Sequence, residues 1–331
     1  MRILITGSTG FLGRHVLAAA RRIPDARLRL AVRTPPPAGG HTVPGPADPG
    51  SAVPGPVEYV PADLADPATL DGLCRDVDVL LHCASLVGGD EAAMAAVNDR
   101  GTAALVDDAR RHRVRRIGYL STAAVHGRGP FRGERTTELP LDPASPTSRT
   151  RAAAERHVLA AGGTVLRPNL VYGTGDRWFA PGLARLHRRL TADPDGWSAR
   201  LTVVEAGDLA ELALAAALAP EPLPGAYLVG EPEPVLCATV VAALAEHAGL
   251  VPHRAATDLA TARAALAGDP GAEVALHLTT TDRWFAVDDL RRRLGLPPAP
   301  GLTARFPAHA PWYTAALAAD AAPTPASQGA R

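Results

Sequence analysis

The segment ITGSTGFLGRHV (residues 5–16) decides the fold of this 331-residue chain. It follows the apolar run RILIT and opens a helical pattern, so its glycines lie in a turn between a strand and a helix. Gly7 permits a tight turn, Gly10 lets the backbone approach a pyrophosphate, and Gly13 permits close packing of the helix on the strand. The helix then presents free amides and a positive dipole end to the phosphates. This setting predicts a dinucleotide site, although the spacing is G-x-x-G-x-x-G instead of the commoner G-x-G-x-x-G.

Short apolar runs continue beyond this turn and alternate with helical patterns. The expected parallel strands are RILIT, RLRLAV, VEYV, VDVLLHC, RRIGYLS and TVLRP. The segments with helical spacing between them are GFLGRHVLAAARR, DPATLDGLC, EAAMAAVNDRGTAALVDDARRH and TSRTRAAAERHVLAA. This alternation predicts an α/β fold: a Rossmann-type, doubly wound parallel sheet with helices on both faces.

Composition argues against several classes of partner. The 34 basic residues, all arginine, balance 34 acidic residues, so no charge excess points to nucleic acid or an anionic membrane. Cys74, Cys83 and Cys237 have no metal-ligand spacing, and no metal site is predicted. The longest apolar stretch, residues 209–219, is too short to cross a bilayer. Because MRILITGS begins directly as a strand, without a signal peptide, we expect a cytoplasmic protein.

Two segments break the alternating pattern. Residues 34–56 contain eight prolines and five glycines and are expected to form a surface insertion. A second interpretation, a lid over the adenosine end of a cofactor, stays open because the insertion leaves the strand that normally meets the ribose. Residues 321–331 are expected to be a disordered tail.

The end of the second strand, LAVRT, bears on the choice of cofactor. A site that prefers NAD usually places an acid here for the ribose 2′-hydroxyl, whereas this chain has Arg33. A guanidinium matches a 2′-phosphate in charge and in its planar set of donors. NADP(H) is therefore the predicted cofactor, the alternative being that Arg33 simply begins the insertion.

Together these segments resemble the extended short-chain dehydrogenase/reductases of the nucleotide-sugar epimerase/dehydratase type. The matching motifs, between residue 1 and about residue 295, are TGSTGFLG, PADLAD, LLHCAS, VNDRGT, YLSTAAVHG, LRPNLVYGTGD, EAGDLAELAL, GAYLVG and WFAVDDLRRRLG. The resemblance implies a smaller substrate domain interleaved with the Rossmann domain. It assigns residues 1–172 and 201–230 to the NADP(H)-binding domain, and residues 173–200 and 231–320 to the substrate domain.

The resemblance also implies which residues surround the cofactor. Asp63 and Leu64 would lie beside the adenine, and the HCAS turn (residues 82–85) beside the ribose and pyrophosphate. Pro168 and Asn169 would pass close to the nicotinamide carboxamide. The expected cofactor-binding residues are Thr6, Gly7, Thr9, Gly10, Phe11, Leu12, Gly13, Arg33, Asp63, Leu64, Cys83, Ala84, Ser85, Arg151, Pro168 and Asn169.

The resembled family uses a catalytic Asn, a Ser or Thr, and a Tyr and Lys spaced Y-x-x-x-K, and this chain keeps half of that group. Asn98 matches the first residue, and Thr122, with Ser121 beside it, matches the hydroxyl. Thr147 stands at the tyrosine position and Arg151 at the lysine position. No tyrosine elsewhere in the chain has a basic residue four positions on.

The missing tyrosine limits the chemistry. Arginine does not readily give up a proton, and a threonine hydroxyl is a far weaker acid than a phenol. General acid–base assistance contributes about 10²–10⁴ in rate, so its loss costs roughly 3–5 kcal/mol. Oxidising an alcohol requires a base, whereas the acid needed to reduce a ketone can belong to the substrate. A phenol beside the carbonyl can donate its proton intramolecularly, with a gain of several kcal/mol from proximity.

Other side chains are candidates for smaller roles. His126 is the nearby group that titrates near neutrality, or else a loop histidine bonded to backbone. Thr147 either orients substrate or is a plain first-turn residue of a helix. Trp178 and Phe179 either stack on a flat substrate or pack in a core. Leu86 and Val87 complete the predicted substrate contacts.

Members of this superfamily that lack the tyrosine and lysine include ketoreductases that tailor aromatic polyketides such as angucyclinones. The resemblance therefore implies NADPH-dependent reduction of a ketone on a bulky aromatic polyketide, a small-molecule substrate, in antibiotic biosynthesis, with the proton supplied by the substrate. A nucleotide-sugar epimerase or dehydratase, and a non-catalytic NADP(H)-binding sensor, are the alternatives. Whether the chain is a monomer or a homodimer stays open.

Overall fold

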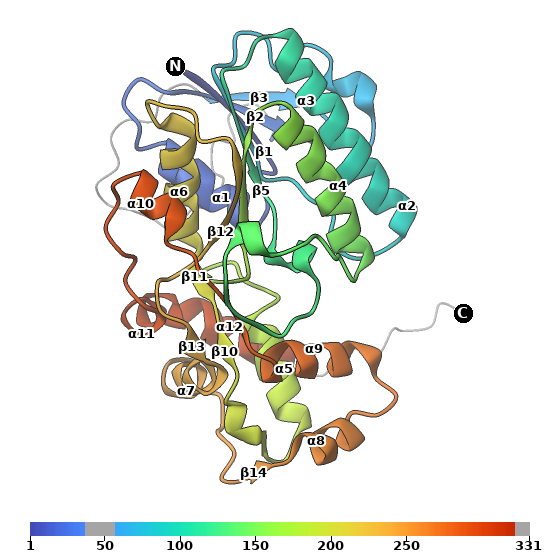
Figure 1. Ribbon diagram of the computed structural model, residues 1–331, viewed down its shortest axis with the longest axis vertical. Coiled ribbons are helices and arrows are strands. Elements are labelled where there is room, and N and C mark those ends of the chain that lie inside the picture. The colour runs from blue at the N-terminus through green and yellow to red at the C-terminus, as the bar shows by residue number, and fades with distance from the viewer. Residues whose placement is uncertain (37–56, 322–331) are drawn as a thin grey trace.

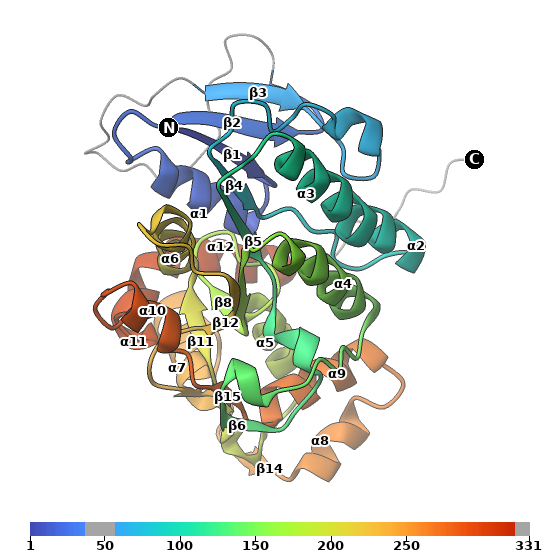
Figure 2. The same cartoon turned by 45° about the horizontal axis from the view of Figure 1, so that its top comes forward.

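A seven-stranded parallel sheet forms one lobe of the molecule, and a helix-rich lobe lies below it in the computed structural model (Figure 1; Figure 2). The structure describes residues 1–36 and 57–321. The strand order is β12-β7-β5-β4-β1-β2-β3, and every neighbouring pair is parallel. The strands of this sheet are β1 (Arg2–Thr6), β2 (Arg27–Val32), β3 (Val57–Pro61), β4 (Val79–His82), β5 (Arg116–Leu120), β7 (Thr164–Pro168) and β12 (Gly225–Val229).

Helices cover both faces of this sheet because its strands are apolar on both faces. Alternate residues of β1 enter different cores: Ile3 and Ile5 pack on one side, and Leu4 on the other. In Figure 1 helices α1 and α6 lie on one side of the sheet, and α3 and α4 on the other. The helices of this lobe are α1 (Phe11–Ala20), α2 (Glu91–Met94), α3 (Gly101–Arg111), α4 (Pro146–Ala160), α6 (Ala206–Leu218) and α10 (Asp289–Arg293).

The second lobe has its own core, built around the buried aromatic side chains of Tyr172, Trp197, Phe306 and Tyr313. Its helices are α5 (Ala180–Arg189), α7 (Cys237–Ala248), α8 (Leu259–Ala265), α9 (Pro270–Thr280), α11 (Leu302–Arg305) and α12 (Ala310–Ala321). A mixed sheet joins β13 (Val235–Leu236), β10 (Arg200–Leu201), β15 (Arg283–Phe285) and β6 (Phe131–Glu134). Two short parallel pairs join β11 (Val203–Glu205) to β8 (Leu170–Tyr172) and β14 (Ala256–Thr257) to β9 (Asp193–Pro194).

The predicted doubly wound sheet is confirmed, and each of the six strands expected from apolar runs is present. The helix expected in DPATLDGLC is wrong: only residues Pro67–Leu70 form a 3₁₀ turn. The carboxylate of Asp108 accepts hydrogen bonds from the amides of Gly72 (2.9 Å) and Cys74 (2.7 Å). Those amides are therefore not available to a continuing helix, and Gly72 has a φ of +74°.

Some expectations concern residues at the margins of the described chain. Helix α12 ends at Ala321, so the first residue of the expected disordered tail is helical. Residues 322–331, and residues 37–56 of the proline-rich insertion, lie outside the described residues. In the described part of the chain, no helix has the length and apolar character needed to cross a membrane.

Candidate functional site

The glycine turn after β1 has the close backbone approaches that its sequence predicts. Gly7 has a φ of +70°, and its carbonyl accepts a hydrogen bond from the amide of Gly10 (2.9 Å). A Cβ atom on Gly13 would lie 2.0 Å from the Gly7 carbonyl oxygen, so only glycine fits there. Gly10 caps α1 without a side-chain hydrogen bond, and both Thr9 and Gly10 are exposed. The first-turn amides of α1 are thus free to bind an anion.

The loop after β4 lies against this turn. A Cβ on Gly7 would lie 2.6 Å from the amide nitrogen of Ala84. That amide donates to Thr6 Oγ1 (3.3 Å), and the same hydroxyl oxygen lies 2.6 Å from His82 Nδ1. Burial, followed by the charge of Arg151, lowers the pKa of His82 to about 3, so the ring is neutral. His82 therefore acts as a fixed support for the loop that contains Cys83, Ala84 and Ser85.

The tautomer of His82 follows from its second partner. Thr102 donates its hydroxyl hydrogen to the carbonyl of Asn98 (2.5 Å). Since that hydrogen is used, Thr102 Oγ1 accepts from His82 Nε2 at 2.9 Å, and Nδ1 accepts from Thr6. The chain of hydrogen bonds links β1, β4 and α3 below the turn.

Asn98 uses its whole amide to hold the same loop. Its Oδ1 accepts from the amide of Leu86 (2.7 Å), and its Nδ2 donates to the carbonyl of Leu86 (2.9 Å) and to Thr150 Oγ1 (3.0 Å). Asn98 lies in a π-helical segment, Ala95–Arg100, between α2 and α3. Such segments often occur at functional sites. Here the segment aims a 2 % exposed amide at the loop, so Asn98 positions backbone and does not face a substrate.

Thr147 and Arg151 lie on α4 with their polar groups directed at protein atoms. Thr147 Oγ1 donates to Met94 Sδ (3.3 Å) and lies 3.4 Å from the amide of Gly88, which donates to it. Arg151 donates from Nη2 to the carbonyl of Leu120, and its guanidinium carbon lies 5.8 Å from the centre of the Tyr119 ring. Neither side chain supplies an acidic proton at the position of the missing tyrosine.

Ser121 and Thr122 are adjacent in sequence but have different hydrogen bonds. Ser121 is 2 % exposed, and its hydroxyl donates to Glu155 Oε1 (2.5 Å). Its hydrogen is therefore not available to a substrate. Thr122 is half-buried, and its Oγ1 accepts from the amide of Ala124 (3.1 Å). Within the described residues the hydroxyl hydrogen of Thr122 has no acceptor, so it can point to a ligand.

A buried ion pair lies behind these hydroxyls, and sequence reasoning did not identify it. Arg167 contacts both oxygens of Glu155, with Nη2 to Oε2 at 2.5 Å and Nε to Oε1 at 3.0 Å. Both side chains are almost fully buried. The signal was present, because Arg167 interrupts the apolar strand TVLRP and a buried guanidinium requires a carboxylate partner.

His126 belongs to the same network. Its Nδ1 donates to the carbonyl of Pro140 (2.8 Å), which leaves Nε2 to accept from Arg167 Nη1 (3.1 Å). Burial lowers the pKa of His126, although its bond to Pro140 opposes this effect. The side chain is 4 % exposed. His126 is therefore the backbone-bonded histidine of the two interpretations, and it is not placed to deliver a proton.

The remaining predicted residues are distributed more widely. Asn169 donates through Nδ2 to the carbonyls of Thr202 (3.1 Å) and Arg283 (3.2 Å), and Pro168 is buried at the end of β7. Phe179 is 8 % exposed and packs in the core of the second lobe, whereas Trp178 is 68 % exposed. The other predicted positions are Phe11, Leu12, Asp63 and Leu64, which are half-buried like Leu86, and Arg33 and Val87, which are exposed.

The residues around the turn fit a dinucleotide. The bare glycine backbone leaves room for a pyrophosphate, and α1 offers its free amides. In the described part of the chain, Ser8 Oγ, Ser85 Oγ and Arg151 Nε are buried polar atoms without a hydrogen-bond partner. Ser8 and Ser85 lie on the segments at the carboxyl ends of β1 and β4, and Arg151 of α4 reaches the carbonyl of Leu120 at the carboxyl end of β5. Ligands of open α/β sheets bind at this edge.

Comparison with known proteins identifies two reductases with partial sequence similarity. The chain is 29 % identical over 261 residues to the 2-alkyl-3-oxoalkanoate reductase of Stenotrophomonas maltophilia, a match that covers 71 % of this chain and 72 % of that protein. It is 31 % identical over 194 residues to the 4-hydroxy-2-methyl-3-oxo-4-farnesyl-3,4-dihydroquinoline-1-oxide ketoreductase of Stigmatella aurantiaca. The second match covers 55 % of this chain and 54 % of that protein, so it spans about half of the relative's length.

Solved structures show the same fold at lower identity. MoeE5 in complex with UDP-glucose and NAD superimposes with a TM-score of 0.72 at 21 % identity, and covers 96 % of this chain and 100 % of its own. WbmH of Bordetella bronchiseptica in complex with NAD⁺ has a TM-score of 0.72 at 19 % identity, and covers 94 % and 98 %. The sequence profile of the NAD dependent epimerase/dehydratase family matches residues 3–230. The chain therefore belongs to the NAD dependent epimerase/dehydratase family.

Proposed function

We propose that the protein is an NADPH-dependent ketoreductase that reduces a carbonyl of an angucyclinone-like aromatic polyketide. In this proposal the protein has a role similar to that of the angucyclinone ketoreductase of the simocyclinone pathway. Two relatives are described as reductases of oxo compounds, which supports reduction as the reaction. We place the activity in the cytoplasm.

One observation carries the proposal: among the described residues, no acidic side chain stands where the family has its tyrosine. The Thr147 hydroxyl is bonded to Met94, and Arg151 is bonded to the carbonyl of Leu120. His126 and Ser121 are buried and bonded elsewhere. The site therefore has no group suited to removing a hydroxyl proton, as the oxidation of an alcohol requires. A ketone with its own acidic hydroxyl group can be reduced without such a group.

The proposed reaction distributes its atoms between substrate and protein. A nicotinamide cofactor held at the glycine turn would supply the hydride that the carbonyl carbon takes up. The carbonyl oxygen takes its proton from a neighbouring phenol of the substrate, and the phenolate is later reprotonated by water. Thr122 donates a hydrogen bond to the same oxygen and so stabilises the charge that develops on it. Trp178, which is exposed, stacks on the flat ring system.

The cofactor would be held by the residues of the turn and its neighbours. Gly7, Gly10 and the amides of α1 bind the pyrophosphate, and Ser85 and Arg151 bind ribose hydroxyls. Arg33, exposed at the end of β2, binds the 2′-phosphate.

Transfer of an isotope from the cofactor tests this function. We would incubate the protein with 4S-deuterated NADPH and matched ketones with and without a neighbouring phenol, and analyse the products by mass spectrometry. Deuterium in the phenol-bearing alcohols alone is the expected result. Equal transfer to both sets of ketones would refute proton donation by the substrate.

Two other outcomes would replace the proposal. Tight NADPH binding without transfer to any ketone would indicate a non-catalytic sensor. Conversion of a nucleotide sugar without net consumption of NADPH would indicate an epimerase or a dehydratase.

A further inference from the structure

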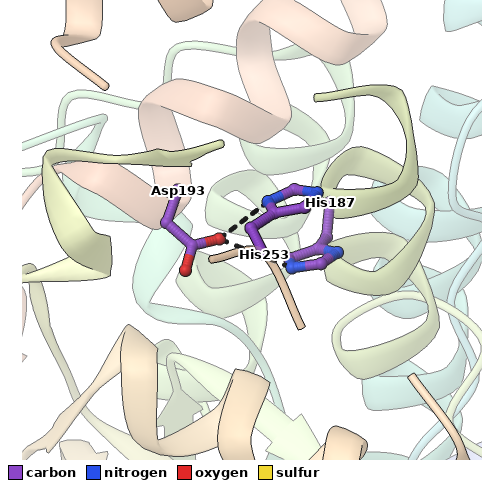
Figure 3. Close-up of side chains that lie close together, drawn as sticks. All are labelled: His187, Asp193 and His253. Carbon is purple, nitrogen blue, oxygen red and sulfur yellow. Dashed lines mark hydrogen bonds and ion pairs between the residues drawn. The ribbon is translucent and has the colours of Figure 1, made fainter. Parts of the chain in front are cut away.

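Two histidines and an aspartate converge in the second lobe, away from the glycine turn (Figure 3). His187 lies on α5, Asp193 on β9, and His253 in the segment between α7 and β14. His187 Nε2 lies 3.4 Å from Asp193 Oδ1, and His253 Nδ1 lies 2.9 Å from the same oxygen. One potential ligand atom from each residue lies within 4.8 Å of the others.

The most buried of the three side chains is that of His187. His187 is 1 % exposed, and within the described residues its Nε2 has no hydrogen-bond partner. A neutral imidazole with an unused nitrogen is the form that binds a metal ion. A buried nitrogen without a partner otherwise costs free energy.

Surrounding contacts hold the three side chains in place. The short pairing of β9 with β14 includes the bond from the Asp193 amide to the carbonyl of Ala255 (2.9 Å), which brings the His253 segment alongside. Trp197 Nε1 donates to Asp193 Oδ1 (2.8 Å) and orients the carboxylate. The two imidazole rings stack with centroids 3.7 Å apart and planes within 6°. A hydrogen bond to a ligand carboxylate, such as the one from Trp197, orients the ligands of metal sites.

We propose that His187, Asp193 and His253 form a binding site for a divalent transition-metal ion, with Zn²⁺ as its natural occupant. Two imidazole nitrogens and one carboxylate oxygen are a common set of zinc ligands, and water completes the tetrahedron. Each ligand atom must come to about 2.0–2.2 Å from the ion. When the neutral His253 ring binds the ion through Nδ1, its one ring hydrogen moves to Nε2, so the lone pair of Nδ1 faces the ion and the Asp193 oxygen is freed to bind it. The ion cross-links α5 to the β9–β14 pair and stabilises this lobe.

Metal titration of the untagged protein tests the site. We would measure Zn²⁺ binding by equilibrium dialysis with elemental analysis, and record the visible spectrum with Co²⁺. We expect one Zn²⁺ per chain, the visible bands of four-coordinate Co²⁺, and a melting temperature that rises with Zn²⁺. His253→Ala should weaken Zn²⁺ binding at least tenfold and abolish the rise in melting temperature.

A matched variant separates this site from ordinary histidine–carboxylate pairs. His157 pairs with Asp99 at 2.8 Å and, among the residues that the structure describes, is not part of a three-residue cluster. His157→Ala should therefore bind Zn²⁺ like the unchanged chain. Unchanged binding in His253→Ala, or no saturable binding up to about 1 mM Zn²⁺, would overturn the proposal. If His253→Ala does not fold, the Co²⁺ spectrum of the unchanged protein tests the proposal instead. A six-coordinate spectrum would overturn the proposal.

Discussion

Thr122 combines a half-buried hydroxyl with a hydrogen that no described residue accepts, and in the proposed function this hydroxyl donates to the carbonyl oxygen. We expect Thr122→Val to lower kcat about tenfold, because one hydrogen bond to the carbonyl oxygen, worth roughly 1.4 kcal/mol, is lost. Thr122→Ser keeps the hydroxyl and should retain most activity. Steady-state kinetics with a phenol-bearing ketone measure both.

Replacing the candidate proton donors one at a time tests whether the protein or the substrate supplies the proton. Thr147→Val should change kcat by less than about threefold, because its hydroxyl is bonded to Met94. A loss above about a hundredfold in Thr122→Val, Thr147→Val or His126→Ala would show that the protein supplies the acid.

Gly13 tests the nucleotide turn. A Cβ at this position would lie 2.0 Å from the Gly7 carbonyl oxygen, which is backbone and cannot rotate away. We expect Gly13→Ala to weaken NADPH binding at least tenfold, as measured by fluorescence titration. Gly182→Ala in α5 is the control, since its Cβ would meet only the flexible end of Arg185 at 3.6 Å. Equal NADPH affinity in the two variants would contradict the role of the turn.

Arg33 tests the choice of cofactor. We expect Arg33→Ala to reduce NADPH affinity about tenfold and to leave NADH affinity unchanged, because only NADPH has the 2′-phosphate. Arg27→Ala, an exposed arginine at the opposite end of β2, should change neither affinity. The same loss for both cofactors in Arg33→Ala would argue against a 2′-phosphate contact.

At the scale of elements, α4 connects the hydroxyl pair to the core. Ser145 caps the helix by accepting from the amide of Ser148 (3.1 Å), and Pro146 occupies its first turn. One turn beyond Arg151, Glu155 meets Arg167 of β7 and Ser121 after β5. The helix thus fixes both Thr147 and the strand ends from one face.

The buried ion pair of α4 predicts a large stability effect. Glu155→Ala leaves the Arg167 guanidinium buried without its partner, and we expect a loss of about 3–5 kcal/mol in the free energy of unfolding. Glu91→Ala breaks a pair of similar length with Arg149 (2.8 Å), but at the surface, so we expect less than about 1 kcal/mol. Urea denaturation compares the two, and similar losses would refute the role of burial.

At the scale of the whole molecule, we expect stability to depend on the buried carboxyl group of Glu231. Burial raises the pKa of Glu231 to about 7, with a smaller contribution from Asp208, while Tyr172 and Arg305 oppose it. The Tyr172 hydroxyl donates to Glu231 Oε1 at 2.7 Å. The folded state therefore holds a proton that the unfolded state has lost above pH about 4.5.

This pKa gives a pH dependence with a definite sign. Between pH 4.5 and 7 the folded chain binds more protons than the unfolded chain at Glu231, so this residue makes stability fall as pH rises. Glu231→Gln should remove that fall and be more stable than the unchanged protein at pH 8, by about 1–3 kcal/mol. Glu233→Gln, an exposed neighbour, should follow the unchanged protein. Parallel stability curves for Glu231→Gln and the unchanged chain would contradict the assignment.

The second lobe was the part of the molecule least visible to sequence reasoning. Its strands have two to four residues, too short to show a period of apolar residues. Its histidine–aspartate cluster joins positions 6 and 60 residues apart, so no motif spacing indicates it. The division of the chain into residues 1–172 with 201–230, and 173–200 with 231–320, stays a prediction.

The sequence by itself determined the parallel sheet and the glycine turn, because both depend on local signals. Apolar runs of strand length and glycines at fixed spacing act over a few residues of chain. Only the tertiary structure decided which polar groups are free, because each hydrogen-bond partner comes from a distant segment. The Ser121 hydroxyl donates its hydrogen bond to Glu155, 34 residues away, and the Thr147 hydroxyl donates to Met94, 53 residues away. Within the described residues the Thr122 hydroxyl donates no hydrogen bond, and no local sequence pattern distinguishes Thr122 from Ser121 in this respect.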